Sequence, residues 1–290
     1  MRWRGERQSD NVEDYRGRST GGKLAIGGGL GTILIVVIGL LMGKSPLAIF
    51  SDVMDNRQTT SVQQQKDTRS INDPNDTTGQ LVSMVLASTE DVWGKVFQQA
   101  GASYQMPKLQ MFTGTTQTAC GVGQDVMGPF YCPADQKIYI DLGFLDELRN
   151  KFKAPGNFAA AYVIAHEVGH HVQNLLGTSG KVDQLRGRLN EAEFNKYSVA
   201  LELQADFYAG VWANHAQKMR NILDPGDLEV ALRAANAIGD DKLQKQAQGY
   251  VVPDAFTHGT SEQRMYWFKK GFETGDLNQG NTFKALGLVN

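Results

Sequence analysis

The segment from Leu24 to Gly43 constrains the fold most, because it is apolar and carries no charge over its whole length. As a helix, about 20 residues extend about 30 Å, which matches the hydrocarbon core of a bilayer. Lys23 and Lys44 flank it, and a helix this long that is apolar on all sides is typical of a membrane span. The sequence therefore predicts a transmembrane helix over residues 24–43.

The charges around this segment predict its orientation. Positive residues are denser before it than after it; those before it are Arg2, Arg4, Arg7, Arg16, Arg18 and Lys23. The positive-inside rule then places the N-terminus in the cytoplasm and the rest of the chain outside a bacterial cytoplasmic membrane, as a single-pass protein. A cleaved signal peptide, which would release a soluble secreted protein, is the main alternative. The length of the apolar run and the large, mixed-charge segment before it argue against cleavage.

Four segments follow from composition. Residues 1–23 form a basic tail, polar and rich in glycine and arginine, which we expect to be cytoplasmic and disordered. Residues 24–43 form the span, residues 44–78 form a polar linker, and residues 79–290 form one globular domain. The formal net charge of −2 and the absence of a long basic stripe predict no nucleic-acid partner.

The globular region predicts an α+β domain that is mostly helical with a small sheet. Lys108–Phe112 and Lys137–Asp141 have the character of short strands. Helical apolar spacing and terminal residues predict helices over 80–100, 142–151, 157–176, 189–219, 227–248 and 261–272. We expect Asn157 to cap the third of these helices, and Thr260 or Ser261 to cap the last.

The helix predicted over 157–176 carries His166-Glu167-Val168-Gly169-His170. Histidines at positions i and i+4 lie one turn apart on the same helix face, so both imidazoles can bind one tetrahedral Zn²⁺. Glu167 lies beside the first ligand, where it can act as a general base on a zinc-activated water. Two unrelated histidines on a helix are the alternative, and the helical context argues against it.

A catalytic zinc commonly has three protein ligands, so a third is expected elsewhere in the chain. The helix predicted over 189–219 places Glu202 and Asp206 one turn apart among small and apolar residues. A carboxylate in such a surface is costly unless it meets a metal or a partner. We therefore predict Glu202 as the third ligand and Asp206 as the acceptor that orients a ligand histidine. Two acids on a solvated helix face are the alternative.

At this point the chain resembles a known family. The motif around His166 and the Glu202–Asp206 pair are similar to zincins with a glutamate ligand. With the segments CGVGQDVMGPFYCPADQKIYIDLGFL and HGTSEQRMYWF, nearly the whole chain resembles the bacterial YpfJ-like neutral zinc metallopeptidase family. The resemblance implies Zn²⁺ as cofactor, a peptidase-like fold and a peptide or protein substrate, but no particular substrate.

Further residues are weaker candidates for the site. His258, just before the last helix, is our candidate donor to the oxyanion, while Tyr208 and Tyr250 are poorer ones. We interpret His215 as structural, and His171 as either structural or a residue that supports the ligands from behind. The strand Lys137–Asp141 is a candidate for pairing with an extended substrate.

The two cysteines, Cys120 and Cys132, would form a disulfide in an oxidising compartment, and otherwise stay as thiols.

Together these features predict a membrane-anchored zinc peptidase in which Glu167 moves the protons of hydrolysis. A membrane-tethered zinc-binding protein without hydrolytic activity is the first alternative, although a purely structural site needs no base. A hydrolase acting on a non-peptide amide is the second alternative, and the sequence does not exclude it.

Overall fold

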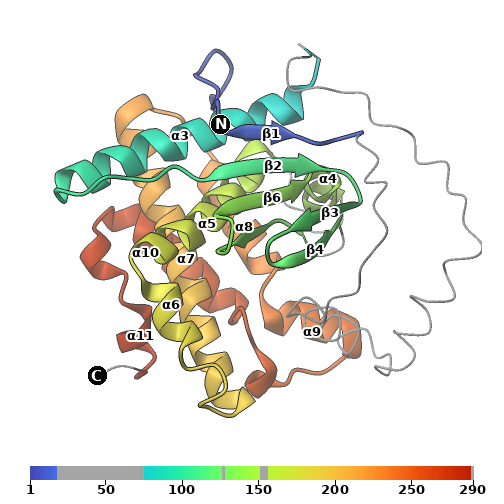
Figure 1. Cartoon of the computed structure of the whole chain (residues 1–290), viewed down its shortest axis with the longest axis vertical. Helices are drawn as coiled ribbons and strands as arrows, with labels where there is room; N and C mark the ends of the chain where they lie inside the picture. Colours follow the sequence, from blue (N-terminus) through green and yellow to red (C-terminus); the bar gives the residue numbers. More distant parts are fainter. Residues whose placement is uncertain (18–72, 74, 126–127, 151–155, 289–290) are drawn as a thin grey trace, which may run out of the picture.

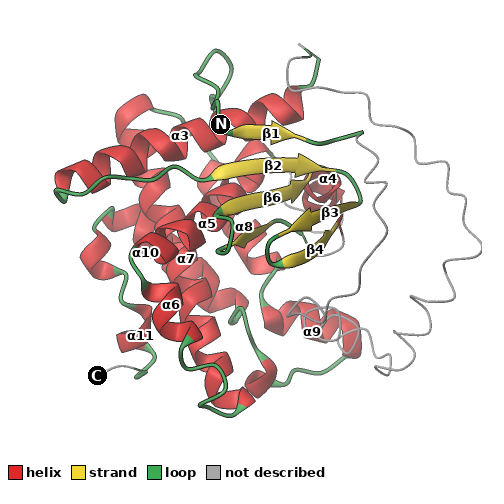
Figure 2. Cartoon of the chain, in the orientation of Figure 1, coloured by secondary structure: helices red, strands yellow, loops and turns green. Residues whose placement is uncertain are grey.

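The computed structural model describes residues 1–17, 73, 75–125, 128–150 and 156–288. They form a mixed α/β structure, mostly helical with a small sheet, as predicted (Figures 1 and 2). The strands are β1 (Val12–Asp14), β2 (Lys108–Phe112), β3 (Thr115–Thr118), β4 (Gly121–Gln124), β5 (Phe130–Cys132) and β6 (Lys137–Asp141). The α-helices are α3 (Thr77–Gln99), α4 (Gly143–Asn150), α5 (Asn157–Leu175), α6 (Thr178–Asp183), α7 (Glu191–Arg220), α8 (Asp227–Ala237), α9 (Asp240–Gln248), α10 (Ser261–Thr274) and α11 (Thr282–Ala285). Short 3-10 helices cover Pro253–Ala255 and Leu277–Gln279.

Helix ends follow local chemistry in most places. Asn190 caps α7 and Thr260 caps α10, each in a capping box with the residue three positions on. The predicted cap at Asn157 is wrong, because Gly156 occupies the cap position and makes no side-chain hydrogen bond. The helix predicted over 227–248 is also wrong as a single element. It breaks at Ile238–Gly239, where a Cβ on Gly239 would collide with the backbone at Ser261 of α10.

The main sheet has four strands in the order β1-β2-β6-β5. β2 runs parallel to both β1 and β6, and β5 pairs antiparallel with β6. β3 and β4 form a separate antiparallel hairpin. Because β6 is bonded to β2 on one side and β5 on the other, the prediction that Lys137–Asp141 pairs with substrate is wrong. In the described chain, the edges of this sheet belong to β1 and β5.

Close helix packing determines where the site residues meet. Gly169 of α5 faces the backbone of α7, and a Cβ there would lie 2.9 Å from the carbonyl oxygen of Ala205. Gly210 of α7 and Gly271 of α10 each face backbone atoms of the opposite helix, which a Cβ would strike. These glycines let α5, α7 and α10 approach closely, so residues from all three helices reach one buried centre.

The N-terminal residues are part of the folded domain. β1 pairs with β2 (Figure 1). The backbone N–H of Ser9 donates to the carbonyl oxygen and the hydroxyl of Ser83 in α3. The prediction of a separate disordered tail is therefore wrong for residues 1–17. The domain also starts before the predicted boundary at residue 79, because Asp76 caps α3 at Thr77.

The predicted span over residues 24–43 lies outside the described residues. Within the residues that are described, no helix combines the length and apolar character needed to cross a membrane. The Cys120–Cys132 disulfide is present and connects the start of β4 to β5.

Candidate active site

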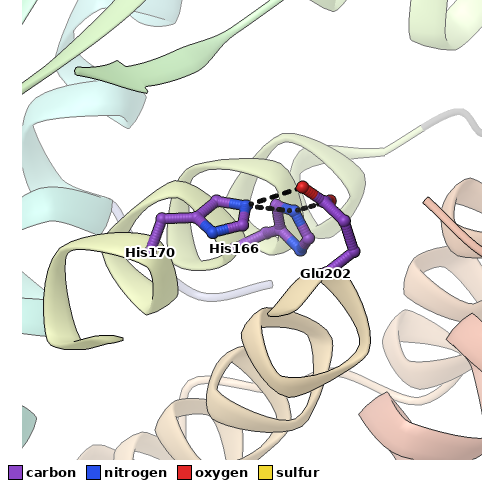
Figure 3. A group of neighbouring side chains, drawn as sticks. All are labelled: His166, His170 and Glu202. Atoms are coloured by element: carbon purple, nitrogen blue, oxygen red, sulfur yellow. Dashed lines mark hydrogen bonds and ion pairs between the residues drawn. The ribbon is translucent and has the colours of Figure 1, made fainter. Parts of the chain in front are cut away.

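Three side chains converge between α5 and α7 (Figure 3). His166 and His170 come from successive turns of α5, and Glu202 reaches them from α7. The Nε2 atoms of the two histidines lie 3.1 Å apart, and Glu202 Oε2 lies 3.1 Å from His166 Nε2. Glu202 Oε1 lies 3.4 Å from His170 Nε2. The structure therefore brings together the three predicted metal ligands.

The outer nitrogen of each ligand histidine is bound to an acceptor. His166 Nδ1 lies 2.8 Å from Asp206 Oδ1, and His170 Nδ1 lies 2.9 Å from Gln173 Oε1. A carboxylate or amide oxygen only accepts, so each Nδ1 donates its proton outward. Each Nε2 is then the nitrogen that can offer a lone pair to a bound metal. Asp206 thus occupies the orienting position predicted from the sequence.

Gln173 is itself held in place by α7 and the C-terminal region. Its amide donates to Leu201 O at 2.7 Å and to Gln204 Oε1 at 3.2 Å. Gln204 in turn donates to Gly280 O at 3.0 Å. These bonds leave the Gln173 carbonyl oxygen directed at His170, so the second histidine is oriented as firmly as the first.

Asp206 is fully buried and is matched by a positive partner. Arg264 of α10 donates from Nε to Asp206 Oδ2 at 2.8 Å and from Nη2 to Oδ1 at 3.0 Å. The hydroxyl of Tyr162 also donates to Asp206 Oδ1. Although burial raises the pKa of Asp206, the Arg264 charge and the neighbouring donors lower it to about 2. Asp206 therefore stays ionised and keeps accepting from His166.

The donor set fits a zinc ion. Two imidazole nitrogens and a carboxylate face one another, so a positive charge among them, a proton or a metal ion, stabilises the arrangement. Ligands of a tetrahedral zinc with Zn–N bonds of 2.0–2.1 Å are separated by roughly 3.4 Å, close to the separations observed here. The pKa of His166 is lowered by burial but raised overall, to about 10, chiefly by Asp206. The group formed by His166, His170 and Glu202 therefore favours a positive charge at its centre.

Glu167 follows His166 on α5 and is 7 % exposed. Burial raises the pKa of its carboxyl group, and the charges of His166 and His170 act in the opposite direction. A carboxyl group whose pKa is raised is a better proton acceptor when ionised, which suits a general base. The role predicted for Glu167 stays a prediction, and the structure shows a buried carboxyl group whose charge interacts with both histidines.

His258 lies in the loop before α10 and is held by Asp240, the first residue of α9. Its Nδ1 lies 3.2 Å from Asp240 Oδ1, and Asp240 Oδ2 accepts from the backbone N–H groups of Thr257, His258 and Gly259. Burial lowers the pKa of His258, but the Asp240 hydrogen bond and the charge of Glu202 raise it overall. The imidazole is thus close enough to Glu202 for their charges to interact.

The remaining histidines, His171 and His215, bond to groups outside the predicted ligand set. His171 Nε2 donates to Gln105 O at 2.6 Å, so its Nδ1 accepts from the hydroxyl of Tyr131 in β5 at 3.0 Å. His215 bonds to Gly275 O at 2.9 Å.

Neither of the two tyrosines considered as oxyanion donors contacts the predicted ligands in the described structure. Tyr208 is buried against Trp93 and Phe207, and Tyr250 is exposed on the surface.

Four residues of the site were missed by the sequence argument: Tyr162, Gln173, Asp240 and Arg264. Gln173 follows His170 by three positions on the same helix, so helical spacing alone could have identified it. Tyr162 precedes His166 by four positions and offers the same signal. Asp240 and Arg264 lie on other helices, and no local pattern connects them to the histidines.

The comparisons with known proteins agree with this geometry. Residues 1–283 match the family model described as "Putative neutral zinc metallopeptidase". The chain is 51 % identical over 288 residues to "Uncharacterized protein YpfJ" of Escherichia coli (strain K12), covering 98 % of this chain and 99 % of that protein. It is 41 % identical over 211 residues to "Uncharacterized protein Mb2605" of Mycobacterium bovis and to "Uncharacterized protein Rv2575" of Mycobacterium tuberculosis, covering 69 % of each chain compared. No solved structure matches the chain. The chain belongs to the neutral zinc metallopeptidase family.

Proposed function

We propose that the protein is a zinc-dependent peptidase that hydrolyses peptide bonds in a peptide or protein substrate. One observation carries the proposal. His166, His170 and Glu202 converge with both Nε2 atoms directed inward, and the buried carboxyl group of Glu167 is close enough for its charge to interact with all three. A site that served only to hold a structural metal would not need a carboxylate with a raised pKa at this position.

Zinc, when bound, supplies a Lewis acid that polarises a carbonyl and makes water more acidic. Glu167 accepts the proton of the attacking water and passes it to the leaving amine. His258 is positioned by Asp240 and has a raised pKa, so it can donate a hydrogen bond to the oxyanion. Asp206 and Gln173 keep the ligand imidazoles in the required tautomer throughout.

The substrate strand in this proposal is β5 rather than β6. β5 is an edge strand of the main sheet as described, and an extended peptide adds to such an edge through backbone hydrogen bonds. Tyr131 of β5 bonds to His171 and to Asn174 of α5, at 3.0 and 3.1 Å. These two contacts fix the edge strand relative to the helix that carries His166 and His170.

Replacement of Glu167 tests the proposal. Glu167→Gln keeps the size of the side chain but removes the base, so we expect hydrolysis of an unfolded protein substrate to fall by about 10²–10⁴-fold while zinc stays bound. Glu262→Gln, at an exposed position of α10, is the matched control and should retain full activity. Wild-type activity in Glu167→Gln would contradict the proposed role, and loss of zinc would show that Glu167 holds the metal instead.

We also propose that residues 24–43 attach the enzyme to a bacterial membrane, on the support of their sequence. Full-length protein should sediment with membranes and resist extraction by alkaline carbonate. A chain that lacks residues 24–43 should be found in the soluble fraction. If both chains are soluble, the proposed attachment is wrong.

A further inference from the structure

A buried acid of α3 takes its partners from the first residues of the chain. Glu90 is 1 % exposed. Its carboxylate accepts from Arg7 Nη2 at 2.8 Å, from Asn11 Nδ2 at 2.8 Å and from the Ser9 hydroxyl. A buried carboxylate that loses such partners strongly destabilises the fold. The stability of α3 therefore depends on residues 7–11.

The first residue before α3 shows the same dependence. Asp76 caps the helix through the backbone N–H of Gly79 and is 1 % exposed. Arg16 Nη2 donates to Asp76 Oδ2 at 2.6 Å and to Asp14 Oδ2 at 2.6 Å, and the Arg16 side chain is fully buried. The charge of the Asp76 carboxylate, which caps α3, is thus neutralised by Arg16. In the sequence, Arg16 precedes residues 24–43 and Asp76 follows them.

Other contacts extend along the whole N-terminal segment. Val12, Glu13 and Asp14 pair in parallel with Leu109, Gln110 and Met111 of β2. Beyond them, the backbone N–H of Arg2 donates to Ile222 O at 2.7 Å, and its guanidinium pairs with Asp224 at 2.9 Å. Residues 1–17 therefore bind α3, the main sheet and the loop after α7.

We propose that residues 1–17 and the metal-binding domain lie on the same side of the membrane. A single crossing between Gly17 and Asp73 would separate them by a hydrocarbon core about 30 Å thick. None of the contacts with Glu90, Asp76 or β2 spans such a distance. The contacts of residues 1–17 with α3 and β2 are therefore incompatible with a single crossing between the two parts of the fold.

This proposal replaces the orientation inferred from positive residues. Arg2, Arg7 and Arg16 belonged to the charge excess that placed the N-terminus in the cytoplasm. Each pairs with a carboxylate, at Asp224, at Glu90 and at Asp76 respectively. The fold itself thus accounts for these three arginines. The excess of positive residues before residue 24 therefore indicates membrane orientation less strongly than the same excess in an unstructured tail would.

Cysteine labelling in intact cells tests the proposal on the full-length chain. Asp10 lies in the N-terminal segment and Gln99 ends α3, and both are exposed. Single variants Asp10→Cys and Gln99→Cys would be treated with a membrane-impermeant maleimide before and after permeabilisation. The parent chain, with Cys120 and Cys132 only, gives the background to subtract. Thermal unfolding of each variant confirms that the fold is kept.

We expect the two positions to give the same ratio of labelling in intact cells to labelling after permeabilisation. A ratio near one at both positions places the shared side outside the cytoplasm, and a ratio near zero at both places it inside. Either result supports the proposal. Labelling of Gln99→Cys but not of Asp10→Cys in intact cells would restore the single crossing and overturn the proposal, as would the reverse pattern. The result does not depend on whether the protein is a peptidase.

Discussion

Removal of the Arg264 guanidinium should weaken both the fold and the metal site. Arg264→Met keeps much of the side-chain volume but leaves the carboxylate of Asp206 buried without its positive partner. Arg264 is 3 % exposed, Asp206 is fully buried, and two hydrogen bonds at 2.8 and 3.0 Å join them. Breaking such a pair costs about 3–5 kcal/mol. This is a large part of the 5–15 kcal/mol that is typical of a folded domain.

The same substitution should also reduce zinc affinity. Asp206 would no longer be held by α10, so its hydrogen bond with His166 Nδ1 would weaken. Loss of a partner that orients a ligand typically lowers metal affinity by about 10–100-fold. Urea unfolding of the zinc-free protein would measure the first effect, and competition with a chelating dye would measure the second. Arg233→Met, at an exposed position of α8, is the control and should change stability by less than about 0.5 kcal/mol.

A double-mutant cycle separates the pair from simple loss of packing. Asp206→Asn removes the other charge, so Arg264→Met should cost much less in that background. The interaction between the two sites should be about 2–3 kcal/mol. Our interpretation is refuted if Arg264→Met changes stability no more than Arg233→Met does, or if the two substitutions in the cycle are additive.

Two further predictions concern residues outside the ligand group. His258→Ala should lower kcat by about 10²–10³-fold with zinc content unchanged, and a loss of zinc instead would show that His258 is a ligand. Replacing Cys120 and Cys132 together by serine should lower the free energy of unfolding by roughly 3 kcal/mol in the chain-entropy model. Equal urea midpoints for this variant and wild type would show that the disulfide does not stabilise the fold.

The ligand set could be predicted from the sequence because its signals are local. His166 and His170 are one helical turn apart, so their convergence follows from helix geometry as soon as the helix is recognised. Glu202 and Asp206 stood out because two acids interrupt an apolar helix face. The strands Lys108–Phe112 and Lys137–Asp141 were also confirmed with the same bounds.

The partners that complete the site could not be predicted in this way. Arg264 is 58 positions from Asp206 in sequence, and Asp240 is 18 positions from His258. They meet only because of how the helices pack and because Gly239 breaks the helix predicted over 227–248. The edge position of β5 likewise depends on sheet order, which no single strand encodes.

The N-terminal segment gave the largest difference between sequence and structure. Its polar, arginine-rich composition is typical of a disordered tail, because composition does not show where the charges find partners. Arg7 pairs with Glu90, which is 83 positions away in the sequence, and Arg2 pairs with Asp224, which is 222 positions away. A short strand such as Val12–Asp14 is also too brief to be recognised by alternation of polar and apolar residues.

Zinc content of the full-length protein, compared with that of Glu202→Ala, tests the central claim most directly. We expect about one zinc per chain in wild type and a clear loss in the variant, because two histidines without a third ligand bind zinc more weakly. Glu262→Ala, at an exposed position of α10, should retain the wild-type content. Full retention of zinc in Glu202→Ala, or no zinc in wild-type protein supplied with the metal, would contradict the proposed three-ligand site.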